Sequence, residues 1–185
     1  MGLLLAFAPF IAFFALVRLI SPFAGLIAAL VVSLVLCGRM MLRREAVKTL
    51  EIGTLVLFAA LVLWTIVIGT EWSIARVRLA VDAGLLAIVV ISLLVGRPFT
   101  LQYARERVPE PLWNTPQFLA TSRIVALVWA GAFAVLVAAD AAAEYVPEIP
   151  VRADVWASVA ALVGAFWFTG WYPDQVRRRN NAGSV

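Results

Sequence analysis

Residues 52–70 read IGTLVLFAALVLWTIVIGT, nineteen positions without a single charged side chain. A helix needs about 20 mostly apolar residues to cross a bilayer, so this stretch has the length of one span. Its apolar residues follow one another continuously, without the polar alternation of a membrane β-strand. The stretch therefore predicts a transmembrane α-helix.

Five further segments share this apolar character, and together they predict an all-α polytopic membrane protein with six transmembrane helices. They are residues 1–17, 19–38, 79–96, 124–139 and 155–173.

A tight turn near Ser21 and Pro22 must join the first two segments, because so few residues separate them. The first segment contains Pro9 and has an alternative: a re-entrant or interfacial helix that leaves five full spans. We expect one transmembrane helical domain over residues 1–173 and a short basic cytoplasmic tail over residues 174–185.

Composition supports this class and excludes others. Of the 185 residues, 64% are apolar and 14% are charged, which matches neither a soluble globular domain nor a disordered chain. There is no histidine and one cysteine, Cys37, so imidazole-ligated haem, histidine-based zinc sites, histidine triads and intrachain disulfides are all excluded. We expect no cofactor, no metal and no nucleic-acid partner.

The basic residues predict an orientation. With six spans, eleven Lys and Arg side chains fall on one side of the membrane and four on the other. The basic side is cytoplasmic by the positive-inside rule, which places both termini inside the cell and next to anionic lipid headgroups. If the first segment does not cross, only the N-terminus moves to the outer side.

Asp82 is the acid that falls inside a predicted span, and an ionisable group within a membrane is a functional candidate. It is the fourth residue of segment 79–96, about 5 Å along the helix axis. Arg78 is four residues earlier on the same helical face, so a shallow interfacial ion pair is the first interpretation. The alternative is a polar, anion-binding site in which Arg18 and Arg78 surround Asp82.

The longest polar segment, residues 97–118, mixes basic and aromatic side chains on the predicted cytoplasmic side. Such a mixture fits a segment that lies on anionic headgroups or a surface that binds a partner, and simple anchoring of the loop is the alternative. The candidate residues are Arg97, Tyr103, Arg105, Arg107 and Trp113.

Two stretches resemble the intracellular septation protein A family. The first is Phe7-Ala-Pro9-Phe-Ile-Ala-Phe13-Phe14-Ala15-Leu-Val-Arg18. The second is Arg97-Pro98 at the end of a span, followed by Val108-Pro-Glu-Pro111-Leu-Trp113. The family's glycine is missing from this loop, as in a divergent member.

The resemblance implies a multi-pass protein of the Gram-negative inner membrane that maintains the cell envelope and is linked to the septation and elongation machinery. It implies no catalytic residues. We therefore expect a non-enzymatic protein that acts through envelope or division proteins in the inner membrane, and self-association stays open. The alternative is a small-solute or lipid-handling transporter that uses a polar site at Arg18, Arg78 and Asp82.

Overall fold

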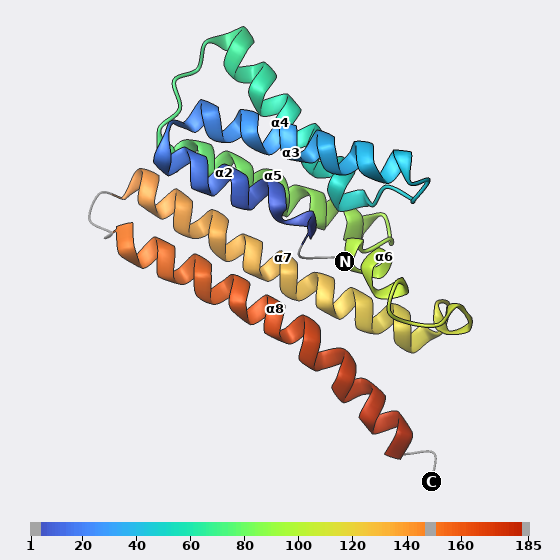
Figure 1. Ribbon diagram of the computed structural model, residues 1–185. Coiled ribbons are helices and arrows are strands. Elements are labelled where there is room, and N and C mark those ends of the chain that lie inside the picture. The colour runs from blue at the N-terminus through green and yellow to red at the C-terminus, as the bar shows by residue number, and fades with distance from the viewer. Residues whose placement is uncertain (1–4, 147–150, 183–185) are drawn as a thin grey trace. The chain divides into compact units, whose positions relative to one another are not determined.

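The computed structural model describes residues 5–146 and 151–182, with backbone alone at 151–153 and 179–182, and all regular structure within them is helical. The helices in chain order (Figure 1) are α2 (Ala8–Leu19), α3 (Pro22–Leu42), α4 (Thr49–Ile68), α5 (Ile74–Leu94), α6 (Phe99–Arg105), the 3-10 helix η1 (Glu110–Leu112), α7 (Pro116–Tyr145) and α8 (Val151–Ala182).

The all-α polytopic prediction is confirmed. Helices α3, α4, α5 and α7 and the segment Asp154–Arg178 of α8 are long and apolar enough to cross a membrane. The first segment differs: α2 has 12 residues, or about 18 Å of helix at 1.5 Å per residue, against a hydrocarbon core of about 30 Å. Among the described residues five helices are therefore long enough to span and α2 is not, as the five-span alternative expects; residues 1–4 of the first segment lie outside the described residues.

Helix ends lie at the residues that local chemistry favours. Pro22 is the first residue of α3, and the Ser21 hydroxyl accepts a hydrogen bond from the Ala24 N–H at 3.1 Å, which confirms the tight turn expected there. Thr115 and Pro116 repeat this arrangement at the start of α7. At the end of α4, Gly69 adopts φ +68°, the left-handed conformation that closes a helix without strain.

By its internal contacts the chain divides into an N-terminal unit, Met1–Ile88, and a C-terminal unit, Val89–Val185. The first contains α2, α3, α4 and most of α5. The second contains the end of α5 and everything that follows. Residues 174–182, expected as a tail, continue α8 through Pro173.

The core of the N-terminal unit is built from aromatic side chains of the short helix. The Phe10 and Phe13 rings of α2 both contact the Phe58 ring of α4, with centroid distances of 5.4 and 5.8 Å. Phe13 and Phe58 are fully buried. Although α2 is too short to span, it thus fills the space beside α3 and α4.

Glycine allows a close helix approach in this unit. A Cβ atom added at Gly25 of α3 would lie 2.5 Å from Val17 Cγ2 and 3.0 Å from the Phe13 carbonyl oxygen. Neither neighbour can easily move, because one belongs to a β-branched side chain and the other to helical backbone. Small residues take this role in membrane helices, where close backbone approach gives the packing energy.

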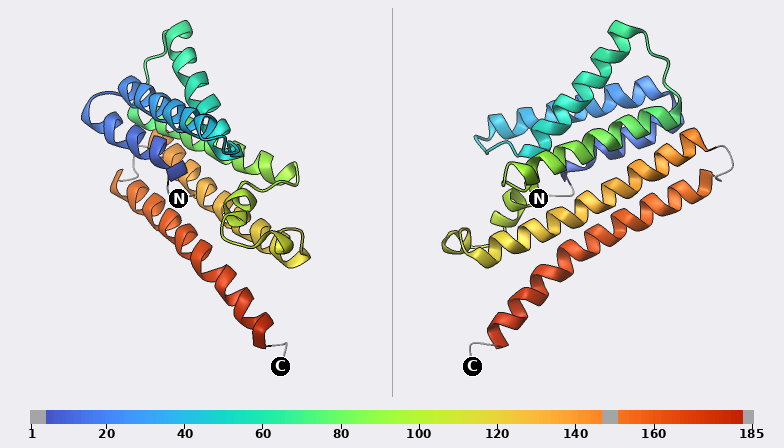
Figure 2. Two further views of the ribbon diagram at one scale, coloured as in Figure 1. Left: turned by 45° about the vertical axis from the view of Figure 1, so that its right-hand side comes forward. Right: turned by 180° about the vertical axis from the view of Figure 1, so that it is seen from behind.

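In the C-terminal unit, α7 and α8 run antiparallel and side by side (Figures 1 and 2). Trp129 of α7 is fully buried, and its ring contacts Phe166 of α8 edge-to-face at 4.9 Å. Its indole N–H donates to the Thr169 hydroxyl at 2.9 Å, and that hydroxyl donates to the Ala165 carbonyl. This contact fixes the register of the two helices.

Gly25→Ala is expected to lower the free energy of unfolding by about 1–3 kcal/mol, the usual cost of overpacking a core. Gly38→Ala on the same helix is the matched control, since an added Cβ there meets no atom within 4 Å. Thermal unfolding of the two purified variants in detergent measures the difference. Equal stability would contradict the close contact between α2 and α3.

Candidate functional site

Asp82 is deeper in its helix than the apolar run indicates. Because the Ser73 hydroxyl accepts a hydrogen bond from the Arg76 N–H at 3.0 Å, α5 starts at Ile74 rather than at residue 79. Asp82 is then the ninth helical residue, about 12 Å from the start of the helix. Its side chain is 1% exposed, so the carboxylate is packed within the protein and not hydrated at an interface.

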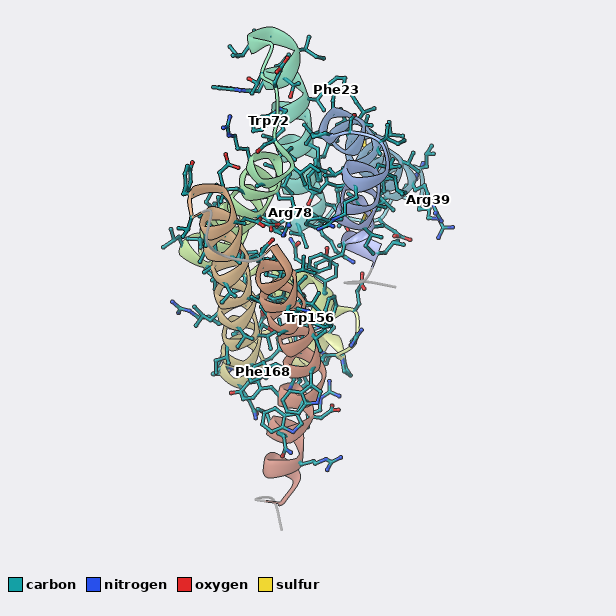
Figure 3. All side chains as sticks on the ribbon, turned by 90° about the vertical axis from the view of Figure 1, so that its left-hand side faces the viewer. Phe23, Arg39, Trp72, Arg78, Trp156 and Phe168 are labelled. Atoms are coloured by element: carbon teal, nitrogen blue, oxygen red, sulfur yellow. The ribbon has the colours of Figure 1, made fainter. Side chains whose placement is uncertain are left out.

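The structure places the two candidate arginines differently. Arg78 of α5, labelled in Figure 3, is half-buried. Its guanidinium carbon lies 5.9 Å from the centroid of the Phe14 ring of α2, a cation–π contact within the N-terminal unit. Arg18 is exposed in the last turn of α2, where a cation complements the helix dipole. Arg78 thus shares the buried face of Asp82, and Arg18 is solvent-accessible.

Two further buried acids lie in the C-terminal unit. Asp140 of α7 is 1% exposed and Asp154 of α8 is 3% exposed. Neither was predicted as a site residue, because each directly adjoins the end of a predicted span. Their position next to an apolar run was the sequence signal that could have identified them. In the structure α7 continues to Tyr145 and α8 begins at Val151, so both acids are helical and packed.

The register of α7 and α8 puts these acids at one level. Asp140 is eleven residues after Trp129, and Asp154 is twelve residues before Phe166, the residue that Trp129 contacts. Equal distances along antiparallel helices bring both acids to the same end of the hairpin.

A narrow crevice of about 170 Å³ lies among α2, α3 and α4, and it leaves no room for a water molecule. The hydroxyls of Ser33 and Thr54 face it, both are buried, and neither has a hydrogen-bond partner within the part of the chain that the structure describes. In its present shape the crevice holds no ligand. Over the same described ranges, no three histidine, cysteine, aspartate or glutamate side chains gather as metal ligands.

The polar segment after α5 is folded and anchored. The Ser92 hydroxyl of α5 accepts a hydrogen bond from the Phe99 N–H at 3.2 Å. The Thr100 hydroxyl of α6 donates to the Ser122 carbonyl of α7 at 2.7 Å. Phe99 is fully buried. Residues 97–113 therefore form a fixed cap on the C-terminal unit rather than a mobile loop, and we refer to them as the cap.

The candidate residues of the cap divide by exposure. Tyr103 is 7% exposed and packs edge-to-face against Phe99, so it supports the cap from inside. Arg105 lies over the Trp113 ring at 5.2 Å, and the Trp113 indole donates to a backbone carbonyl of the cap. Arg97 and Arg107 are exposed. The surface of the cap therefore presents two exposed guanidinium groups and a cation–π pair.

Fold and site together define a multi-pass α-helical membrane protein with buried acids in its spans and a rigid polar cap. Searches against protein-family models, curated proteins and solved structures find no match to the chain.

Asp82→Asn is expected to lower the free energy of unfolding by about 1–3 kcal/mol, because it alters a group that packing keeps from water. Glu71→Gln, at an exposed acid just before α5, is the matched control and should have no measurable effect. Thermal unfolding in detergent reports both variants. The double variant Arg78→Gln with Asp82→Asn tests whether the two side chains interact. If its loss of unfolding free energy is smaller than the sum of the losses in the two single variants, the side chains are coupled. Unchanged stability of Asp82→Asn would show that burial of this carboxylate is unimportant.

Proposed function

We propose that this chain is a non-enzymatic, multi-pass protein of the bacterial inner membrane that maintains envelope integrity through contacts with septation and elongation proteins. Its C-terminus faces the cytoplasm in this proposal. The resemblance of residues 7–18 and 97–113 to the septation protein A family supports the biological setting. The count of basic residues supports the orientation.

The observation that carries the proposal is the anchored cap. A segment whose backbone and rings are fixed by Ser92, Thr100 and Phe99 holds its surface in one arrangement. Such preorganisation lowers the entropy cost of binding a partner. Exposed Arg97 and Arg107 with the Arg105–Trp113 pair suit an acidic protein surface, since Arg and Trp are frequent energetic centres of interfaces.

The second candidate function is a transporter for a small solute or lipid, and the buried acids favour it. Carboxylates inside membrane spans mark ion or proton pathways in many transporters. Asp82 in one unit and Asp140 and Asp154 in the other are suited to that role. Loss of function in Asp82→Asn or Asp140→Asn at normal protein abundance, with an intact cap, would favour transport over the envelope role.

Arg97→Gln with Arg107→Gln is expected to abolish most of the envelope function while the protein still accumulates, because both side chains are exposed and support no packing. The measurement is growth and cell length in cells that lack the chromosomal copy and express the variant. Arg43→Gln with Arg44→Gln removes the same charge from the other basic loop and serves as control. Full activity of the cap variant would refute the cap as the contact surface.

Cysteine labelling tests the orientation in a Cys37→Ala background, which removes the single native thiol. We expect Arg44→Cys and Arg107→Cys to resist a membrane-impermeant maleimide in intact cells, because both loops are cytoplasmic. Glu71→Cys should react under the same conditions. The reverse pattern would invert the topology.

A further inference from the structure

The tryptophans of this protein form two groups, which differ in whether the indole N–H donates a hydrogen bond to another protein group. Of seven tryptophans, four donate a hydrogen bond within the protein. The remaining three all belong to α8, where, within the described residues, none of their N–H groups has a protein acceptor. They are Trp156, Trp167 and Trp171, with exposed fractions of 71%, 63% and 42%.

Helix α8 also exposes most of its length. In its apolar segment 6% of the residues are buried, compared with 17% to 39% in the other long helices. Figure 3 shows Trp156 near the start of α8 and Phe168 further along the helix. Exposed indoles with free N–H groups at two levels of one helix are typical of side chains that lie at the two headgroup layers of a bilayer.

The length of α8 places its charged end in the headgroup region. A hydrocarbon core of about 30 Å takes about 20 helical residues. If the core begins near residue 155, it ends near residue 174, and the helix continues to Ala182. Trp171 then lies just inside the boundary, and the exposed Arg177 and Arg178 lie just outside it.

One face of this end of α8 combines aromatic and basic groups. Trp167, Trp171, Asp174 and Arg178 follow one another at spacings of four, three and four residues, so they share a face. The Trp167 and Trp171 rings stack at 5.2 Å with an interplanar angle of 12°. The Arg178 side chain starts on the face of the stacked rings, and its long stem lets the guanidinium reach the headgroup layer.

We propose that this end of α8, with Trp167, Trp171 and Arg178 on one face and Arg177 next to them, binds the phosphate headgroup of an anionic phospholipid. The guanidinium groups supply paired donors for phosphate oxygens, the Trp171 indole N–H supplies a further donor near the boundary, and the stacked rings contact the acyl chains. Asp174 is the one exposed acid on this face, and its charge opposes the anion. The proposal is independent of the role of the cap.

The test uses the full-length protein in phosphatidylcholine vesicles with increasing amounts of phosphatidylglycerol whose acyl chains carry bromine. Bromine quenches indole fluorescence on contact, so the quenching curve gives the local preference for the anionic lipid. We expect enrichment of phosphatidylglycerol at α8 and the loss of this signal in Trp167→Phe with Trp171→Phe. Inorganic phosphate should not compete, because a free ion makes no acyl contact.

Substitutions of the charged residues give the deciding comparison. These residues lie at an exposed end of α8, so their replacement leaves the core unchanged. Each arginine near a lipid surface contributes about a fivefold preference, so Arg177→Gln with Arg178→Gln should lower the preference roughly 25-fold. Asp174→Asn should raise it. Arg39→Gln with Arg43→Gln, two exposed arginines beside another span, is the control with the same charge change.

Four results would overturn the proposal, three of them from the charge variants. They are an unchanged preference in Arg177→Gln with Arg178→Gln, an equal loss in the Arg39 and Arg43 control, or a weaker preference in Asp174→Asn. Equal quenching by brominated phosphatidylcholine and phosphatidylglycerol would also refute it, since α8 would then contact lipid without headgroup selection.

Discussion

Backbone N–H and C=O groups inside a bilayer have no water to bond, and each unsatisfied group costs several kcal/mol. This constraint explains why the described chain is helical wherever it is apolar and why its irregular segments are short or polar. It also explains where the ends are capped: Ser21, Thr115 and Gly69 satisfy groups that a helix leaves open. Once each span is a closed helix, the remaining problem is how the spans pack.

Packing between these helices depends on shape, since lipid chains are as apolar as the side chains they replace. In the N-terminal unit, complementary shape comes from the close helix contact at Gly25 and from the aromatic cluster of Phe10, Phe13 and Phe58. The C-terminal unit uses Trp129 and its hydrogen bond to Thr169. In hydrocarbon a hydrogen bond between helices has few competitors, so it sets a register that apolar contacts alone would leave free to slide.

The class of fold and the positions of the long helices could be predicted from the sequence, because a continuous apolar run of nearly twenty residues has one stable structure in a membrane. The residues at which each helix begins and ends could not be predicted in the same way. Hydropathy identifies the apolar length of a helix. Helices α5 and α7 begin directly after the N-capping residues Ser73 and Thr115, which lie outside that apolar length. The earlier start of α5 places Asp82 deeper in its helix, and the extension of α7 to Tyr145 makes Asp140 helical.

The residue types of the candidate site could be predicted from the sequence, but the directions in which their side chains point could not. The cap was recognised from its basic and aromatic residues, but nothing in that pattern shows that Tyr103 points inward while Arg107 points outward. That distinction arises from tertiary contacts: the buried ring of Phe99 and the Thr100–Ser122 hydrogen bond rotate α6 so that one face is covered. Arg18 is similar, since its neighbours are known only once the short α2 is placed against α3.

The C-terminal unit separates its charges along its length, and this separation has an energetic reason. Asp140 and Asp154 lie at the end where α7 and α8 are joined, whereas the cap, Arg177 and Arg178 lie at the other end. Asp154 is in the first turn of α8, where the positive end of the helix dipole stabilises a carboxylate. Arginine at the far end of the same helix meets the negative end of the dipole and anionic headgroups. In the orientation proposed above, the basic end of the hairpin lies against the cytoplasmic leaflet. The reversed hairpin would carry that end across the bilayer and away from the more anionic leaflet, so the charge separation favours the proposed orientation.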